Sequence, residues 1–162
     1  MNRIIILGLF ISFKNVLNMN ASSIFSFGNT FVLLGWILLI VLPNWKYTQV
    51  LILHGIVVLF AILYTYLFGK DIGSFDPNSF STLANVKALF QNDDAVAAGW
   101  LHYLAFDLFV GAYVVRESQK LGISRWIYTL ILPFTFMFGP VGYLIFFITK
   151  TVKTKSIADI HS

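Results

Sequence analysis

Four apolar runs in the sequence are each long enough to cross a lipid bilayer as a helix. They cover residues 22–42, 47–68, 95–115 and 126–149, and nearly everything between them is loop. A crossing helix needs about 20 apolar residues, because each residue advances the helix by ~1.5 Å. The runs therefore predict an all-α polytopic membrane protein, a bundle of four transmembrane helices.

The composition agrees with repeated membrane crossing. Apolar residues make up 58% of the chain and charged residues 11%, too few for a soluble domain of 162 residues to cover its surface. The Lys and Arg residues cluster near the ends of the apolar runs, where they can meet anionic lipid head groups. We therefore expect membrane lipid, not nucleic acid, as a partner. Cysteine is absent, which excludes disulfides and thiolate metal sites.

The connections between the runs are short or amphipathic. The turn PNWK joins the first two runs into an antiparallel hairpin, and RESQKLGIS joins the last two. Between the hairpins, four apolar residues fall on one side at helical spacing: Phe80, Leu83, Val86 and Phe90. This pattern predicts a short interfacial helix over residues 80–90.

Three regions follow from these runs. Residues 1–21 are an N-terminal segment that is either interfacial or the result of a misassigned start, with Met19 as the alternative initiator; a cleaved signal peptide is a further alternative. Residues 22–150 form the four-helix transmembrane domain, and residues 151–162 form a basic tail. With four spans, seven Lys and Arg lie on the side of the termini and four on the other, which favours cytoplasmic termini.

The third run has the sequence GWLHYLAFDLFVG at its centre, which contains His102 and Asp107. An ionisable group near the bilayer centre costs ~2.5 kcal/mol or more, so it indicates a functional site unless it only holds helices together. On a helical wheel both lie on the half that also carries the Tyr, Trp and Gly residues. We therefore expect Trp100, Tyr103 and Phe106 to face inward, and Leu104 and Leu108 to face lipid or a partner subunit.

His102 and Asp107 are separated by about 140° and ~7.5 Å along a helix, so they do not touch. Depth in the bilayer predicts two pairs with other spans, His54 with Asp107 and His102 with Asn29. The alternative is that these residues only hold helices together. Hydrogen bonds of polar side chains between membrane helices each contribute about 0.6 to 2 kcal/mol to helix association.

The fourth run is interrupted by proline. Pro133 and the pair Gly139-Pro140 each disturb the helical hydrogen bonds, since proline lacks an N–H donor. The interruption predicts either a kinked packing helix or a bend that opens a cavity beside the third span.

Together, NTFVLLGWILLIVLP, LANVKALF, GWLHYLAFDLFVG and GPVGYL resemble the abscisic-acid-deficient-four-like family of small membrane proteins. Plant members of this family are tied to neoxanthin formation from violaxanthin, so the resemblance implies a carotenoid or related isoprenoid substrate. An acid-base isomerisation needs no cofactor, and we expect His102, Asp107 and His54 to be catalytic. The expected substrate-binding residues are Trp100, Tyr103, Phe106, Asn29 and Pro140.

Three alternatives remain at this point. Oxidative carotenoid cleavage would use iron, for which His54, His102 and Asp107 match a two-His, one-carboxylate set in composition only. A proton or small-solute conduit would require homo-oligomers, since four spans rarely enclose a pathway. A non-catalytic protein that stabilises a membrane enzyme is the third. In each case we expect a multi-pass protein of a bacterial cell membrane.

Overall fold

The computed structural model describes residues 19–70, 73 and 76–155, and this part of the chain is all-helical. Residues 1–18 of the predicted N-terminal segment lie outside the described residues. So do residues 156–162 of the predicted tail. The boundaries of the three predicted regions stay a prediction.

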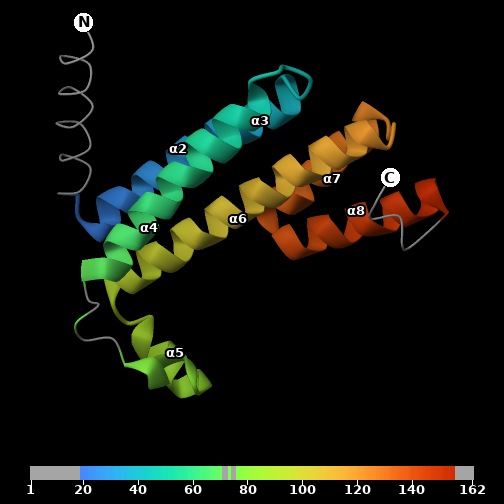
Figure 1. Ribbon diagram of the computed structural model, residues 1–162. Helices are drawn as coiled ribbons and strands as arrows, with labels where there is room; N and C mark the ends of the chain where they lie inside the picture. Colours follow the sequence, from blue (N-terminus) through green and yellow to red (C-terminus); the bar gives the residue numbers. More distant parts are fainter. Residues whose placement is uncertain (1–18, 71–72, 74–75, 156–162) are drawn as a thin grey trace, which may run out of the picture. The chain divides into compact units, whose positions relative to one another are not determined.

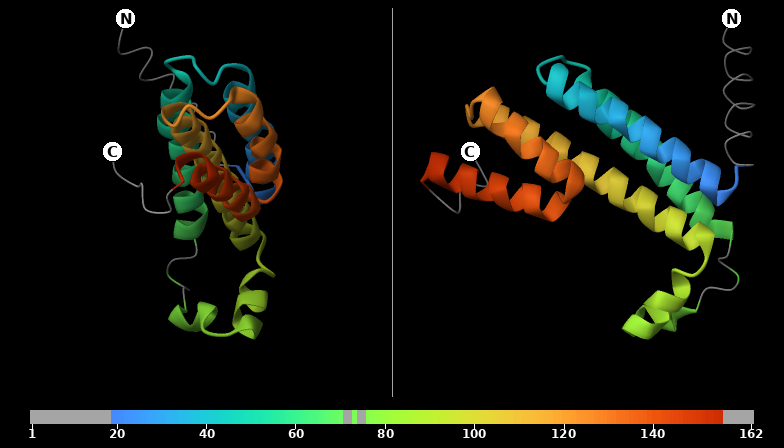
Figure 2. Two further views of the ribbon diagram at one scale, coloured as in Figure 1. Left: turned by 90° about the vertical axis from the view of Figure 1, so that its right-hand side faces the viewer. Right: turned by 180° about the vertical axis from the view of Figure 1, so that it is seen from behind.

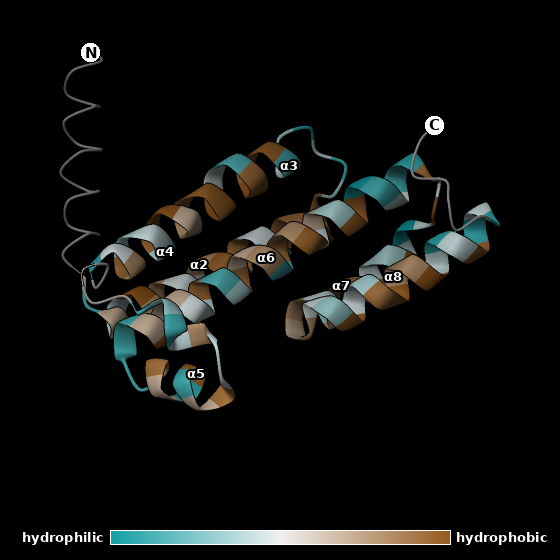
Figure 3. Cartoon of the chain, turned by 60° about the horizontal axis from the view of Figure 1, so that its bottom comes forward, coloured by the Kyte–Doolittle hydropathy of each residue, from teal (hydrophilic) through white to brown (hydrophobic). Residues whose placement is uncertain are grey.

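Three helices of the described chain are long and apolar enough to cross a membrane. They are α2 (Ala21–Val41), a continuous helix over Thr48–Lys70, and α6 (Asp93–Lys120). The second consists of α3 (Thr48–Val50), a π-helical segment η1 (Leu51–Val57) and α4 (Val58–Lys70). Figure 3 shows hydrophobic residues along α2 and α4, with hydrophilic ones near helix ends and around α5. The first three predicted spans are confirmed as helices.

The predicted fourth span is not one helix. Residues 126–149 fall in α7 (Arg125–Met137) and α8 (Gly139–Thr154), which are separated at Phe138 by a non-helical backbone (φ −150°, ψ 73°). At ~1.5 Å per residue the two helices are about 20 and 24 Å long, short of a hydrocarbon core of about 30 Å. Figures 1 and 2 show α7 and α8 folded back on each other. A fourth span made of a single helix is therefore not confirmed.

Residues on both sides of Phe138 explain the hairpin. Pro140 stands in the first turn of α8, where a missing N–H is tolerated, whereas Pro133 lies inside α7 without ending it. A side chain at Gly142 would collide with the backbone of Thr135, which is fully buried. Glycine at this position lets the two helices touch backbone to backbone.

The chain divides into two compact units, each described here by itself. Unit 1 comprises residues 19–30 and 60–103, and unit 2 comprises residues 31–59 and 104–155. Unit 1 contains the start of α2, most of α4, the 3₁₀ turn η3 (Pro77–Phe80), α5 (Leu83–Leu89) and the start of α6. The predicted helix near residues 80–90 is confirmed as α5, and its position at the membrane interface stays a prediction.

Side-chain hydrogen bonds to backbone carbonyls hold the turns of unit 2. The side chain of Gln119 donates to the carbonyl of Pro43 at 2.9 Å, and Arg125 donates to the carbonyl of Ile40 at 2.9 Å. These carbonyls belong to the end of α2 and the turn after it, where the helix has no further N–H partners to offer. The bonds fix the start of α7 next to the end of α2.

The prediction of which face of α6 points inward is wrong. Leu104 and Leu108 are buried, at 6% and 0% exposure, whereas Phe106 is 58% exposed. Lipid is as apolar as leucine, so apolarity does not separate a lipid-facing side from a packed one. Small residues decide instead: Ala105 and Ala112 on the same side are buried and allow close packing.

Leu108→Ala is expected to destabilise the protein strongly, because the side chain is fully buried and its loss leaves a cavity; the expected cost is about 2 to 5 kcal/mol. Phe109→Ala is the matched control, since Phe109 neighbours Leu108 but is exposed, and it should unfold close to the parental temperature. Thermal unfolding in detergent measures both. Equal losses would contradict the burial of Leu108.

The hairpin changes the expected topology. Because α7 and α8 are each shorter than the core, we expect them to enter and leave the bilayer on one side, the side of the α2–α3 turn. Of the described basic residues, seven then lie on that side and two on the other. The seven are Lys46, Arg116, Lys120, Arg125, Lys150, Lys153 and Lys155, against Lys70 and Lys87. Reporter tags after Lys46 and at the C-terminus should lie on the same side of the membrane. A tag next to Asn78 should lie on the opposite side. A C-terminal tag that matches the Asn78 tag would show that residues 125–154 cross the membrane.

Candidate functional site

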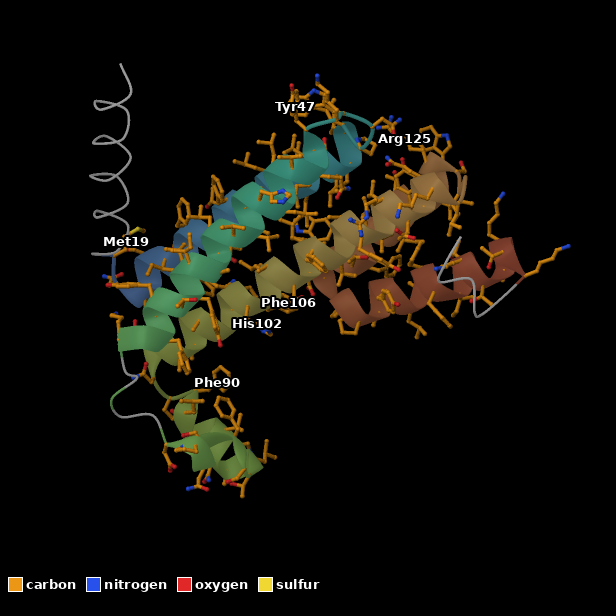
Figure 4. All side chains as sticks on the ribbon, in the orientation of Figure 1. Met19, Tyr47, Phe90, His102, Phe106 and Arg125 are labelled. Carbon is orange, nitrogen blue, oxygen red and sulfur yellow. The ribbon has the colours of Figure 1, made fainter. Side chains whose placement is uncertain are left out.

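Unit 1 contains a cavity of about 450 Å³ between the end of α4, η3, α5 and the start of α6. This volume lies within the range of small-molecule sites, which are apolar with a few fixed polar groups. Its lining is Tyr64, Leu67, Phe68, Asp76, Ser79, Phe80, Ala88, Leu89, Phe90, Asn92, Asp94, Ala95, Ala98, Gly99 and His102. Figure 4 labels His102 on α6 and Phe90 at the end of α5, two of its walls.

Aromatic rings beside His102 form one wall of the cavity. The rings of Tyr64 and Phe68, one helical turn apart on α4, are stacked, with centroids 6.2 Å apart and planes 9° from parallel. The Tyr64 ring also lies 6.0 Å from the imidazole of His102, centroid to centroid. An apolar ligand in this cavity would therefore contact aromatic surface and an acid-base group together.

Carboxylates and an amide supply the polar part of the lining. Lys70 bridges the carboxylate of Asp94 at 2.8 Å, which ties the end of α4 to the start of α6. The side chain of Asn92 accepts the backbone N–H of Asp94 at 2.8 Å and so caps α6. The carboxylate of Asp76 accepts the backbone N–H of Asn78 at 2.9 Å and caps η3. These interactions fix the ends of the elements that enclose the cavity.

Asn29, the predicted partner of His102, bonds to another residue of α6. The indole N–H of Trp100 donates to the side-chain oxygen of Asn29 at 2.7 Å, which links α6 to α2 within unit 1. The Trp100 ring lies 5.4 Å from Phe25 and 5.3 Å from Tyr103. Asn29 therefore holds an aromatic cluster in place, and none of these four residues lines the cavity.

Asp107 lies in unit 2, 7% exposed, with its carboxylate against Gly139, the first residue of α8. A side chain at Gly139 would collide with that carboxylate. The N-terminus of a helix carries partial positive charge and favours an anion, so this position accommodates an acid in an apolar setting. Pro140, a predicted substrate-binding residue, is exposed in the same first turn.

His54 and Asp107, the second predicted pair, differ in their exposure. His54 lies on an exposed side of η1, whereas Asp107 is buried against Gly139. The π-helical hydrogen bonds of η1, from i to i+5, rotate successive side chains by less than the 100° of an α-helix. A wheel drawn with α-helical spacing therefore places His54 on the wrong side.

Phe106 is also apart from the cavity. It belongs to unit 2 and packs with Phe109, ring centroids 6.5 Å apart, on an exposed side of α6.

Across the part of the chain that the structure describes, no group of three or more His, Asp or Glu side chains is close enough to hold a metal ion. Of the eight predicted site residues, the cavity contains His102.

Sequence reasoning missed Tyr64, Phe90, Asp76 and Asp94 as lining residues. No periodicity joins residues from α4, η3 and α5, because they converge through the tertiary fold. The short amphipathic helix between two hairpins was the available signal, since such a helix must pack on the ends of the spans.

The described residues form an all-helical protein with three candidate membrane spans and an apolar cavity in unit 1. A family model described as ABA DEFICIENT 4-like matches residues 23–146, and the chain belongs to this family. The resemblance in the four motifs is thereby confirmed. No solved structure matches the chain.

One curated relative is Protein ABA DEFICIENT 4, chloroplastic, from Arabidopsis thaliana. It is 28% identical to this chain over 144 residues, which cover 82% of this chain and 62% of the relative. The chain therefore spans less than two thirds of the relative's length. The expectation of a bacterial cell membrane is wrong, since the relative is a chloroplastic plant protein.

Proposed function

We propose that this protein binds a carotenoid or related isoprenoid with one end in the cavity of unit 1, and isomerises it there by acid-base chemistry. The observation that carries the proposal is the position of His102, on the lining of an apolar, aromatic cavity. Membership of the family supports an isoprenoid ligand, the class that the resemblance of the sequence motifs to this family implies.

The shape and lining of the cavity suit such a ligand. A polyene with a ring at its end is flat and apolar, and it can lie against the stacked rings of Tyr64 and Phe68. Oxygen substituents on the ring need a few polar partners, which Asn92, Ser79 and His102 offer on the same lining. The polyene chain itself would extend into lipid.

Acid-base isomerisation of an epoxide balances without a redox partner. A C–O bond of the epoxide breaks, a neighbouring carbon loses a proton, and the electrons of that C–H bond form a new carbon–carbon double bond. The epoxide oxygen takes up a proton to become a hydroxyl group. Histidine suits both transfers, because one ring nitrogen accepts a proton while the other donates one. His102 is the proposed proton carrier, while the ion pair of Asp94 with Lys70 ties the end of α4 to the start of α6 at the edge of the cavity.

The proposed chemistry does not use Asp107 or His54. Both belong to unit 2 and neither lines the cavity. Asp107 instead stabilises the start of α8 from its position against Gly139. His54 is exposed whereas Asp107 is buried, so we do not propose them as an acid-base pair.

His102→Gln is expected to lower the conversion rate by about 100-fold or more, the usual contribution of an acid-base group, while ligand binding persists. His54→Gln is the matched comparison, because it makes the same change on a histidine outside the cavity, and it should convert pigment at nearly the parental rate. Chromatography of pigments from hosts that accumulate different carotenoids measures conversion. Full conversion by His102→Gln would remove this residue from the mechanism.

A further inference from the structure

Phe90 packs against a glycine on α6. A Cβ atom built on Gly99 would lie 2.8 Å from Cε1 of Phe90 and 3.3 Å from its Cζ, and it would meet no other side chain within 4 Å. Contact at 3.4 Å or more is ordinary packing. The Phe90 ring can therefore come this close to α6 only because residue 99 has no side chain.

The backbone holds Phe90 in this position. It is the C-terminal cap of α5, and its N–H donates to the carbonyl of Val86 at 3.1 Å. The other end of α5 is capped by Thr82, whose hydroxyl accepts the N–H of Asn85 at 3.1 Å. The side-chain cap at Thr82 and the backbone bond of Phe90 to the last turn of the helix give the ring a defined place.

The contact lies next to the proposed reacting group. Gly99 and His102 are three residues apart on α6, so they occupy neighbouring positions on one helical face. Phe90, Gly99 and His102 all line the cavity. The closeness of the Phe90 ring to Gly99 therefore determines how much room an end group has beside the His102 imidazole.

We propose that Phe90 and Gly99 together form the size-selective wall of the cavity, the feature that decides which ligand end groups reach His102. This inference rests on the proposed function, since it concerns the same ligand. With glycine at residue 99, the space beside His102 admits a substituted ring. A methyl group at residue 99 both occupies part of that space and forces the Phe90 ring away, from 2.8 Å to at least 3.4 Å.

Glycine at residue 99 has a cost that this role explains. Glycine inside a helix is less favourable than alanine by about 0.8 to 1 kcal/mol. The atom in the way of a side chain here is the tip of one ring, not backbone, so alanine would be accommodated by a movement of Phe90. Stability alone does not require glycine at this position, whereas Gly142 meets the backbone of Thr135.

The test measures binding of two carotenoids to the full chain in detergent. Zeaxanthin ends in hydroxylated rings and lycopene ends in open chains. Gly99→Ala should weaken zeaxanthin binding about tenfold, the effect of one methyl group in a fitted pocket, and leave lycopene binding nearly unchanged. Phe90→Ala in the same chain should restore zeaxanthin binding, because Phe90 is the one side chain of the described residues that the new methyl group meets.

Gly69→Ala is the matched control: Gly69 is a helical glycine of the same unit, and a side chain there meets nothing within 4 Å. It should bind both carotenoids like the parent. If Gly99→Ala binds zeaxanthin like the parent, or if Phe90→Ala gives no rescue, the size-selective wall is refuted. If the parent binds neither carotenoid, the proposed function itself fails.

Discussion

Polar groups inside an apolar helix must be satisfied by the same chain, because lipid offers no hydrogen bonds. This constraint organises most of the polar side chains in the spans. Asn29 receives the indole N–H of Trp100, and the amide of Gln49 donates to the carbonyl of Ala112 at 3.1 Å. Asp107 lies at the start of α8. These residues hold helices together, so a polar residue in a span is weak evidence for catalysis here.

His102 differs from these residues by its surroundings. It is exposed on the lining of a cavity, next to the ring of Tyr64, while Asp107 is enclosed by protein. A reacting group has to be reached by its ligand, whereas a structural group has to be shielded. The same distinction separates Asp94, which lines the cavity and bridges Lys70, from Asp107.

The sequence predicted the spans well and their faces badly. Length and apolarity identify α2, Thr48–Lys70 and α6, because only these properties decide whether a helix can cross. The inward face of α6 could not be predicted the same way, since Leu108 suits lipid and a packed core equally. Gly139-Pro140 indicated an interruption, but not that the chain would turn back at Phe138.

The site was predictable only in part, for a related reason. His102 stood out as an ionisable residue in an apolar run, and it does line the cavity. Its predicted partners came from straight α-helices and equal depth, and the π-helical turns of η1 invalidate that geometry for His54. The walls that α5 and η3 contribute depend on how a short polar segment folds back, which no periodicity encodes.

The central claim is that an isoprenoid end group binds beside His102. The chain has three histidines, so their side-chain signals in a nitrogen-15 NMR spectrum are few, and His→Gln variants assign them. Titration with zeaxanthin in detergent should shift the His102 signal and leave the His54 signal in place. A shift confined to His54, or bound zeaxanthin that moves neither signal, would contradict the account.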